Sequence, residues 1–371
     1  MQRMPARPGD SVASIETPAL VVDLDCFGRN LDLMANAVRG SGIALRPHAK
    51  SHKCPEIAKR QMALGAVGIC CQKVDEATTF VEAGIRDVLV TNEIVVPSKL
   101  ARLAGLARTA TIGVLADDLG VVRMISAAAV EAGVTIDVLV EVDVGAHRCG
   151  VMPGPPAVAL ARTVHASPGL RFRGLHAYHG AAQHLRTPAE RRAAIAAAVR
   201  LAQDTRDLVV AAGVACPTVT GAGTGTWQLE RDSHVYTELQ PGSYVFMDAE
   251  YGRNALAADD HAFEQSLYVA ATVMSVPARE RAIVDAGLKA FAMDSGLPVV
   301  HAAHGLDFVG ASDEHGVLRV DPAVAQPAIG ERVWLVPGHC DPTVNLYDWI
   351  VGVRGDRVEC VWPVAARGAL G

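Results

Sequence analysis

Short apolar runs alternate with helical periods over the first 250 residues. In residues 24–38, for example, Phe27, Leu31 and Met34 fall on one face of a helix. The pattern predicts strands at 17–23, 43–49, 67–73, 87–92, 111–116, 136–144, 171–179, 217–222 and 239–246. It predicts helices at 24–38, 55–64, 75–83, 96–107, 118–132, 155–166, 188–212 and 226–234.

This alternation predicts the fold class. Eight of the strands, from 43–49 to 239–246, alternate with helices, which is typical of an α/β protein built on a parallel (β/α)8 barrel. The alternative is an open, doubly wound sheet. No GxGxxG turn follows the first strand, which counts against the dinucleotide-binding form of that sheet.

A change in pattern after about residue 255 predicts a second, smaller and mostly β domain. Helical periods fade there, and apolar runs are separated by Gly, Pro and Asp. These runs lie at 267–276, 281–285, 332–336 and 358–362. We assign residues 24–254 to the barrel, and residues 1–23 with 255–371 to the β domain. The strand at 17–23 goes with the β domain because the barrel is complete without it.

Size, charge and cysteine content narrow the class of protein. The chain has 371 residues, half of them apolar, enough for one large or two ordinary domains. A net charge of -6 and a pI near 6.1 argue against nucleic-acid binding. No apolar run reaches the length of a membrane span, and no signal-peptide pattern opens the chain. The eight cysteines form no CxxC pair, so we expect reduced thiols in a cytoplasmic protein without a nucleic-acid or membrane partner.

A basic cluster follows the apolar run that ends at Leu45. Residues 46–53 read Arg-Pro-His-Ala-Lys-Ser-His-Lys and precede Pro55, a favoured first residue of a helix. Strand ends of this kind carry the ligand sites of α/β proteins. Desolvation and neighbouring cations lower the pKa of a lysine, so a lysine here is expected to be a neutral amine able to attack a carbonyl. The alternative is a solvated basic turn that binds a phosphate or nothing.

Glycine-rich loops follow the last two predicted barrel strands. They read Gly-Ala-Gly-Thr-Gly-Thr-Trp at 221–227 and Gln-Pro-Gly-Ser-Tyr at 240–244. Backbone N–H groups and threonine hydroxyls can bind a phosphate, and these two loops are the usual phosphate site of a barrel. Tight turns are the alternative. Together with a reactive lysine at the first barrel strand, a phosphate site here indicates pyridoxal 5'-phosphate as the cofactor.

Six motifs occur in an order that is characteristic of one family. They are Arg-Pro-His-Ala-Lys-Ser-His-Lys-Cys at 46–54, Val-Asp-Val-Gly-Ala-His-Arg-Cys-Gly at 142–150, Ala-Tyr-His-Gly-Ala-Ala-Gln-His at 177–184, Gly-Thr-Gly-Thr at 223–226, Pro-Gly-Ser-Tyr-Val-Phe-Met-Asp at 241–248 and Gly-His-Cys-Asp-Pro-Thr-Val-Asn at 338–345. The chain resembles the fold-type III pyridoxal-phosphate enzymes, which share the barrel of alanine racemase. Within them it most resembles the D-threonine aldolase and D-serine dehydratase-like family. The resemblance extends from Thr17 to about Trp362.

The resemblance implies a role for each matched cofactor residue. Lys50 matches the lysine that binds the cofactor covalently, Arg148 the arginine near its phenolic oxygen, and Tyr178 the residue that stacks on its ring. The phosphate-binding positions are matched by Thr224, Gly225, Thr226, Gly242, Ser243 and Tyr244. No residue is assigned to the ring nitrogen.

His339, Cys340 and Asp341 offer an imidazole, a thiol and a carboxylate in consecutive positions. On an extended segment, His339 and Asp341 point the same way and can share one ion, while Cys340 faces away. An N/O pair with open positions favours Mn²⁺ over structural zinc, with Mg²⁺, Co²⁺, Ni²⁺ or Zn²⁺ left open. By resemblance, His-x-Asp is typical of the D-threonine aldolases and His-x-Cys of the dehydratases. The alternative is a polar turn before Pro342 with a structural histidine.

Together, these expectations predict a D-threonine aldolase that depends on pyridoxal phosphate and a divalent metal. It would cleave β-hydroxy-D-amino acids such as D-threonine to glycine and an aldehyde. His339 and Asp341 would hold the ion against the β-hydroxyl of the substrate, and His184 is the candidate base for its proton. A surface loop is the alternative explanation of His184.

Other functions remain open on the sequence. The same parts could serve a D-serine or D-threo-3-hydroxyaspartate dehydratase, giving a 2-oxo acid and ammonia. A pyridoxal-phosphate-binding protein without turnover is a second alternative, which the predicted β domain and metal motif disfavour. A racemase would need a tyrosine from a partner subunit, and no motif for it is evident. By resemblance, we expect a homodimer.

Overall fold

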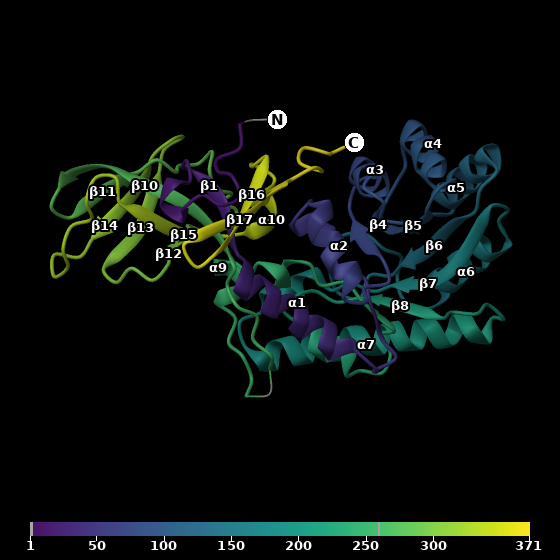
Figure 1. The fold of residues 1–371 in the computed structure, drawn as a ribbon. Coiled ribbons are helices and arrows are strands. Elements are labelled where there is room, and N and C mark those ends of the chain that lie inside the picture. Colours follow the sequence, from purple (N-terminus) through teal and green to yellow (C-terminus); the bar gives the residue numbers. More distant parts are fainter. Residues whose placement is uncertain (1–2, 259) are drawn as a thin grey trace.

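Two β-sheets organise the molecule, and Figure 1 shows them side by side. The computed structural model describes residues 3–258 and 260–371. One sheet has eight parallel strands and carries most of the helices, and the other has nine strands. In the described part of the chain, no helix combines the length and the apolar character that crossing a membrane requires.

The eight-stranded sheet is a parallel barrel. Its strands are β2 (Ala44–Leu45), β3 (Ile69–Cys71), β4 (Asp87–Glu93), β5 (Thr111–Ala116), β6 (Ile136–Glu141), β7 (Leu170–His176), β8 (Thr218–Gly221) and β9 (Glu238–Leu239). They are ordered β2-β9-β8-β7-β6-β5-β4-β3. A parallel bridge between His48 and Cys70 joins the two ends of this order. The predicted α/β barrel with a smaller, mostly β domain is therefore confirmed.

Helices cover the barrel; one precedes the first barrel strand, and the others follow strands β2 to β8. They are α1 (Leu24–Val38), α2 (Pro55–Ala63), α3 (Val74–Glu82), α4 (Pro97–Leu106), α5 (Leu119–Ala132), α6 (Pro155–Ala166), α7 (Pro188–Ala211) and α8 (Trp227–Arg231). The Asp23 side chain caps the start of α1, and Thr187 with Glu190 forms a capping box at α7. The face of α1 that was predicted to be apolar, with Phe27 and Met34, is buried.

Two barrel strands are much shorter than predicted. The expected strands at 43–49 and 239–246 are reduced to the two-residue strands β2 and β9. Pro47 and Pro241 cannot donate a hydrogen bond to a neighbouring strand, so strand pairing ends before them. Short 3-10 helices follow instead, η2 (Ala49–Ser51) and η4 (Ser243–Val245).

The nine-stranded sheet joins the start of the chain to its last third. Its strands are β1 (Ala19–Asp23), β10 (Leu267–Ala278), β11 (Arg281–Val284), β12 (Val299–Val300), β13 (Leu306–Ala311), β14 (Gly316–Val320), β15 (Arg332–Val336), β16 (Trp349–Arg354) and β17 (Arg357–Pro363). β1 pairs with β10 antiparallel and with β16 parallel. Four of these strands, β12, β13, β14 and β16, were not predicted. The domain boundary at residue 254 stays a prediction.

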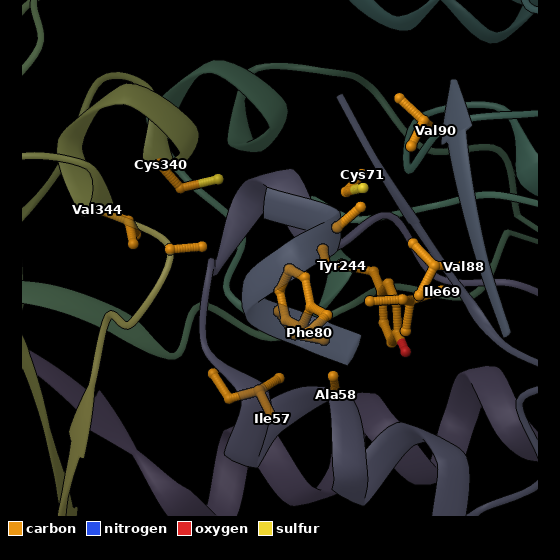
Figure 2. Close-up of a cluster of buried hydrophobic side chains, with 14 of the residues drawn as sticks. Ile57, Ala58, Ile69, Cys71, Phe80, Val88, Val90, Tyr244, Cys340 and Val344 are labelled. Atoms are coloured by element: carbon orange, nitrogen blue, oxygen red, sulfur yellow. The ribbon is translucent and has the colours of Figure 1, made fainter. Parts of the chain in front are cut away.

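A short helix of the second part of the chain packs on the barrel. α10 (Cys340–Val344) contacts η2, the segment that carries Lys50. Figure 2 shows Cys340 and Val344 in one buried cluster with Ile57 and Phe80 from the barrel helices. Apolar packing therefore fixes residues 339–341 beside the end of the first barrel strand.

A glycine in β7 allows a close approach to β8, and its replacement should destabilise the fold. Gly174 has φ +142°, and a Cβ atom there would overlap the carbonyl oxygen of Thr218 on β8. We expect Gly174→Ala to lower the free energy of unfolding by about 2–3 kcal/mol, because both the backbone angle and the contact must be strained. Urea unfolding followed by circular dichroism measures the change.

Gly105→Ala is the matched control. Gly105 lies in α4, and a Cβ atom there would meet no heavy atom of the described chain within 4 Å, its own helix excepted. This variant should be unchanged or stabilised by about 0.5–1 kcal/mol. Equal unfolding midpoints for the two alanine variants would contradict the account of Gly174.

Candidate active site

A cavity opens at the carboxyl ends of the barrel strands. Its lining comes from the ends of strands β2, β3, β4, β7, β8 and β9, from the loop after β6 and from α9 (Ala249–Gly252). The lining residues are His48, Lys50, Gln72, Thr91, Arg148, His176, Tyr178, Ala222, Gly223, Thr224, Gln240, Gly242, Ser243 and Tyr251. Of the predicted cofactor residues, Lys50, Arg148, Tyr178, Thr224, Gly242 and Ser243 are brought together here.

Lys50 forms an ion pair with Asp341, one of the two predicted metal ligands. Burial alone would lower the pKa of Lys50, but attraction to the Asp341 carboxylate outweighs burial and raises it. Burial would likewise raise the pKa of Asp341, but Lys50 and His339 lower it. The prediction of a neutral Lys50 was therefore wrong. The carboxylate that raises its pKa belongs to Asp341, which is distant in the sequence and could not be inferred from the neighbours of Lys50.

His48 supports the backbone of Lys50. Its Nδ1 accepts a hydrogen bond from the Lys50 amide at 3.3 Å, and its Nε2 lies 2.9 Å from Thr91 Oγ1. Burial, with the charge of Lys50, holds the pKa of His48 well below its ordinary value. The neutral ring therefore carries its proton on Nε2, facing Thr91.

Tyr178 and Arg148 form one wall of the cavity. The Arg148 guanidinium lies 5.9 Å from the centroid of the Tyr178 ring, in a cation–π arrangement. Arg148 also lies 3.8 Å from Glu141 at the end of β6. Burial raises the pKa of Tyr178, so this ring stays uncharged and can stack against a planar ligand.

The predicted phosphate residues separate into two groups. The Thr224 hydroxyl is buried and has no hydrogen-bond partner among the described residues. By contrast, the Gly225 amide donates to Gln183 Oε1 at 2.9 Å, and Thr226 Oγ1 bonds Gln183 at 2.8 Å and Glu230 at 2.8 Å. Gly225 and Thr226 line a neighbouring cavity that shares Thr224 with the first.

The other loop departs further from the prediction. Ser243 lines the cavity, but its hydroxyl donates to Asp341 Oδ1 at 3.1 Å. The Tyr244 side chain is buried, accepts a hydrogen bond from Gln61 at 3.1 Å and packs 5.4 Å from the Phe263 ring. A phosphate contact from the Tyr244 side chain is not supported, because its hydroxyl points to α2 rather than into the cavity.

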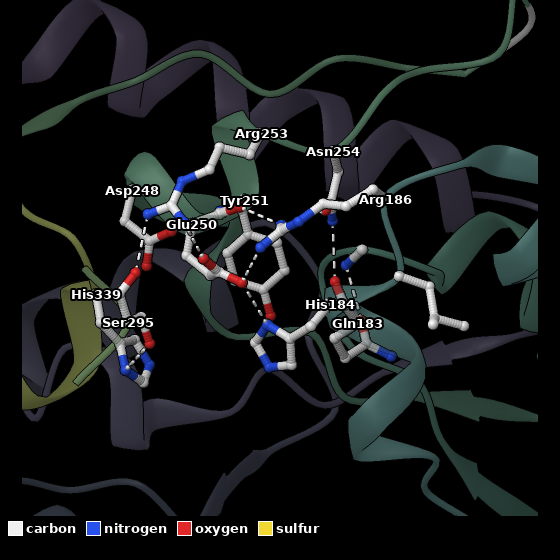
Figure 3. A network of polar contacts seen from close by, with 12 residues as sticks. Gln183, His184, Arg186, Asp248, Glu250, Tyr251, Arg253, Asn254, Ser295 and His339 are labelled. Atoms are coloured by element: carbon white, nitrogen blue, oxygen red, sulfur yellow. Dashed lines mark hydrogen bonds and ion pairs between the residues drawn. The ribbon is translucent and has the colours of Figure 1, made fainter.

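His184 is not one of the residues that line the cavity, but its ring packs beside Tyr251, which is one of them. The two rings lie 6.3 Å apart with an interplanar angle of 29°. His184 Nδ1 lies 3.2 Å from Glu250 Oε1, and Glu250 is also held by Arg186 and Arg253, as Figure 3 shows. Because a carboxylate only accepts, Nδ1 carries the proton and Nε2 of a neutral His184 is free to act as a base.

The metal motif is not the extended segment that was expected. His339 is the residue before α10, and Asp341 lies in the first turn of that helix, so the alternation argument for their common direction was wrong. Cys340 is fully buried, and its Sγ lies 3.2 Å from Asp341 Oδ1. The Cys340 amide donates to Asp248 at 2.8 Å. His339 Nδ1 lies 2.7 Å from Asp294 Oδ2. That His339 and Asp341 share one ion stays a prediction.

The donor set fits the two groups that the sequence predicts. A lysine amine, an aromatic ring under a guanidinium and an unpartnered buried Thr224 hydroxyl suit a planar aldehyde that carries a phosphate. His176 adds a buried Nδ1 without a hydrogen-bond partner in the described chain. One imidazole and one carboxylate suit a divalent ion of intermediate hardness.

Comparisons with known proteins agree with this arrangement. Residues 22–250 match the family described as "Alanine racemase, N-terminal domain", and residues 266–353 match the family described as "Putative serine dehydratase domain". The chain belongs to the fold-type III pyridoxal-phosphate enzymes. The family match covers the whole barrel, and the second match falls on the nine-stranded sheet.

Full-length relatives within this family include aldolases. The chain is 51% identical to a D-threonine aldolase of Arthrobacter sp over 98% of its length and 96% of the relative. It is 44% identical to a 3-hydroxy-D-aspartate aldolase of Paracoccus denitrificans (strain Pd 1222), over 98% of this chain and 95% of that one. The crystal structure of D-threonine aldolase from Filomicrobium marinum superposes with a TM-score of 0.98 at 50% identity, covering 99% of this chain and 100% of that one.

Three residues of the site had no signal in the sequence. Asp294 and Glu250 each contact a predicted histidine, and Tyr251 lies between the cavity and His184. Asp294 lies in a loop without periodicity, and Glu250 and Tyr251 follow directly after the last matched barrel motif, at 241–248. Only the folded chain brings them to the histidines.

Proposed function

We propose that the protein is a D-threonine aldolase that depends on pyridoxal phosphate and a divalent metal. It cleaves β-hydroxy-D-amino acids at the Cα–Cβ bond, and D-threonine gives glycine and acetaldehyde. The observation that carries the proposal is the contact between Lys50 and Asp341, which puts the cofactor lysine against the metal motif. The aldolase relatives support the same reaction.

The cofactor residues are assigned by the family resemblance, and their common place around the cavity supports the assignment. Lys50 would hold the cofactor covalently, Tyr178 would stack on its ring, and Arg148 would neutralise its phenolic oxygen. Thr224 donates its free hydroxyl to the phosphate, together with backbone N–H groups of Gly242 and the neighbouring loop. The bound cofactor supplies a conjugated ring that stabilises negative charge at Cα when the Cα–Cβ bond breaks.

A second group of residues is assigned to the metal and to the proton. His339 and Asp341 hold a divalent ion, which when bound makes the β-hydroxyl of the substrate easier to deprotonate. His184 Nε2 takes that proton, directly or through a water. The electron pair of the broken bond stays at Cα, which takes up a proton to give glycine, and the β-carbon leaves as the aldehyde. Mn²⁺ is the ion we favour, because the donors are one imidazole and one carboxylate.

Assembly and location complete the proposal. We infer a homodimer from the family resemblance alone. A cytoplasmic location is proposed because the eight cysteines are expected to be reduced thiols, and the substrate is proposed to be a small amino acid. No role for nucleic acid is proposed, since the chain carries a net charge of -6.

The first prediction from the proposed function concerns the reaction products. With D-threonine, pyridoxal phosphate and Mn²⁺, the purified protein should release glycine and acetaldehyde, and EDTA should abolish the reaction because the β-hydroxyl loses its metal. Amino-acid analysis and an aldehyde assay measure the products. With D-serine or D-threo-3-hydroxyaspartate, a 2-oxo acid and ammonia would instead make the protein a dehydratase. No turnover with any of these substrates would favour the binding-protein alternative.

The second prediction concerns Lys50. Lys50→Ala should lose the visible absorbance of the bound cofactor and nearly all activity, because no other lysine lines the described cavity. Absorbance after gel filtration measures retention of the cofactor. Lys59→Ala is the control, since Lys59 is exposed on α2 beside Glu56 and should keep both properties. Full absorbance in Lys50→Ala would refute the assignment.

The third prediction separates Thr224 from its neighbours. Thr224→Val should weaken pyridoxal phosphate binding about 10–100-fold, because a hydrogen bond to a charged group is worth about 1.5–3 kcal/mol. Thr224→Ser keeps the hydroxyl and should bind nearly as well as the unmodified protein. Fluorescence titration of cofactor-free protein measures the dissociation constant. Equal affinity of the valine and serine variants would place the phosphate elsewhere.

A further inference from the structure

A carboxylate outside every sequence motif supports the ring of His339. Asp294 lies between β11 and β12, and its Oδ2 lies 2.7 Å from His339 Nδ1. Ser295 donates its hydroxyl to the same Asp294 oxygen at 3.1 Å and lies 3.5 Å from His339 Nδ1. Figure 3 shows Ser295 next to the His339 ring.

The contact decides which nitrogen of His339 is free. A carboxylate has no proton to give, so Nδ1 must donate, and a neutral ring then carries its lone pair on Nε2. Nε2 has no hydrogen-bond partner within residues 3–258 and 260–371. Metal-ligating histidines are commonly oriented in this way by a carboxylate on the second nitrogen.

The loop that carries Asp294 is itself held in place. Arg253 donates to the Ser295 carbonyl oxygen at 2.8 Å and also pairs with Glu250 of α9. Asp248, just before α9, accepts the Cys340 amide at 2.8 Å. Asp248 therefore fixes the main chain next to His339, whereas Asp294 fixes its ring.

We propose that Asp294 is a positioning residue of the metal site. It holds the His339 ring in the orientation and tautomer that presents Nε2 to the divalent ion. As a surface ion pair alone, the contact would add little to the stability of the fold, since more than half of the Asp294 side chain is exposed. The inference rests on the proposed function, because it requires His339 to be a metal ligand.

The test is the affinity for Mn²⁺, measured from the electron paramagnetic resonance signal of the free ion in titrations of the cofactor-loaded protein. Asp294→Ala should weaken Mn²⁺ binding about 10–100-fold. Asp294→Glu should recover part of the affinity, because it restores a carboxylate at a slightly different distance. Pyridoxal phosphate affinity and the thermal unfolding midpoint should stay unchanged, which a general structural defect would not allow.

Asp307→Asn is the matched control. Asp307 is an exposed carboxylate on β13 that pairs with Arg319 in the same sheet. It should bind Mn²⁺ as tightly as the unmodified protein. A loss of affinity equal to that of Asp294→Ala would mean that surface charge alone, not the contact with His339, attracts the ion, and would overturn the inference.

Three further outcomes would overturn it. Unchanged Mn²⁺ affinity in Asp294→Ala, with a clear loss in His339→Ala, would leave the metal site standing and refute only the role of Asp294. Tighter binding in Asp294→Ala would mean that Nδ1 is the ligand and that Asp294 competes with the ion. If His339→Ala and Asp341→Ala both bind Mn²⁺ normally, the proposed metal site itself fails, and the inference fails with it.

Discussion

The contact between Lys50 and Asp341 is the constraint around which the site is built. The two residues are 291 positions apart in the sequence. Lys50 follows the first barrel strand, and Asp341 lies in α10, in the part of the chain that forms the nine-stranded sheet. Neither position alone defines a reactive centre. Their contact requires that the two sheets be held at one fixed relation, because a shift of a few ångströms would separate an amine from a carboxylate.

Two features of the chain enforce that relation. β1 lies inside the nine-stranded sheet, and α1 of the barrel follows it without a linker. Asp23 serves both parts, since its amide bonds the Ser266 carbonyl at 2.8 Å and its side chain caps α1. On the other side, Cys340 and Val344 of α10 are buried in the core that includes the barrel helices, as Figure 2 shows. The active site therefore depends on packing between the sheets as much as on the barrel.

The barrel could be predicted from the sequence because its order is local. The long helices repeat an apolar face every three to four residues, and some begin at a recognisable cap, as Asp23 and Thr187 illustrate. The nine-stranded sheet was only partly predictable. In β13, one buried residue, Phe308, is flanked by exposed or half-buried positions, so the run carries almost no apolar pattern. The strand gains its stability from pairing with β14, which a local pattern does not contain.

The residues of the site were also only partly predictable from the sequence. Motifs singled out Lys50, Tyr178, Thr224 and His339, because Lys50 lies in a basic cluster and Thr224 and His339 lie next to glycines. The charge state of Lys50 was predicted wrongly, since the decisive carboxylate comes from Asp341 across the fold. The partners of the histidines could not be predicted at all, because contacts such as that between His339 and Asp294 span 45 positions without a pattern.

The two histidines of the site are supported by the same kind of contact but in different electrostatic surroundings. Glu250 behind His184 is shared with Arg186 and Arg253, so its charge is largely neutralised and it mainly orients the ring. Asp294 behind His339 has no arginine or lysine partner among the described residues. Its undivided charge can strengthen the imidazole as a ligand for a cation. A base that must release its proton in every cycle and a ligand that must hold an ion throughout make opposite demands. The two carboxylate environments match that difference.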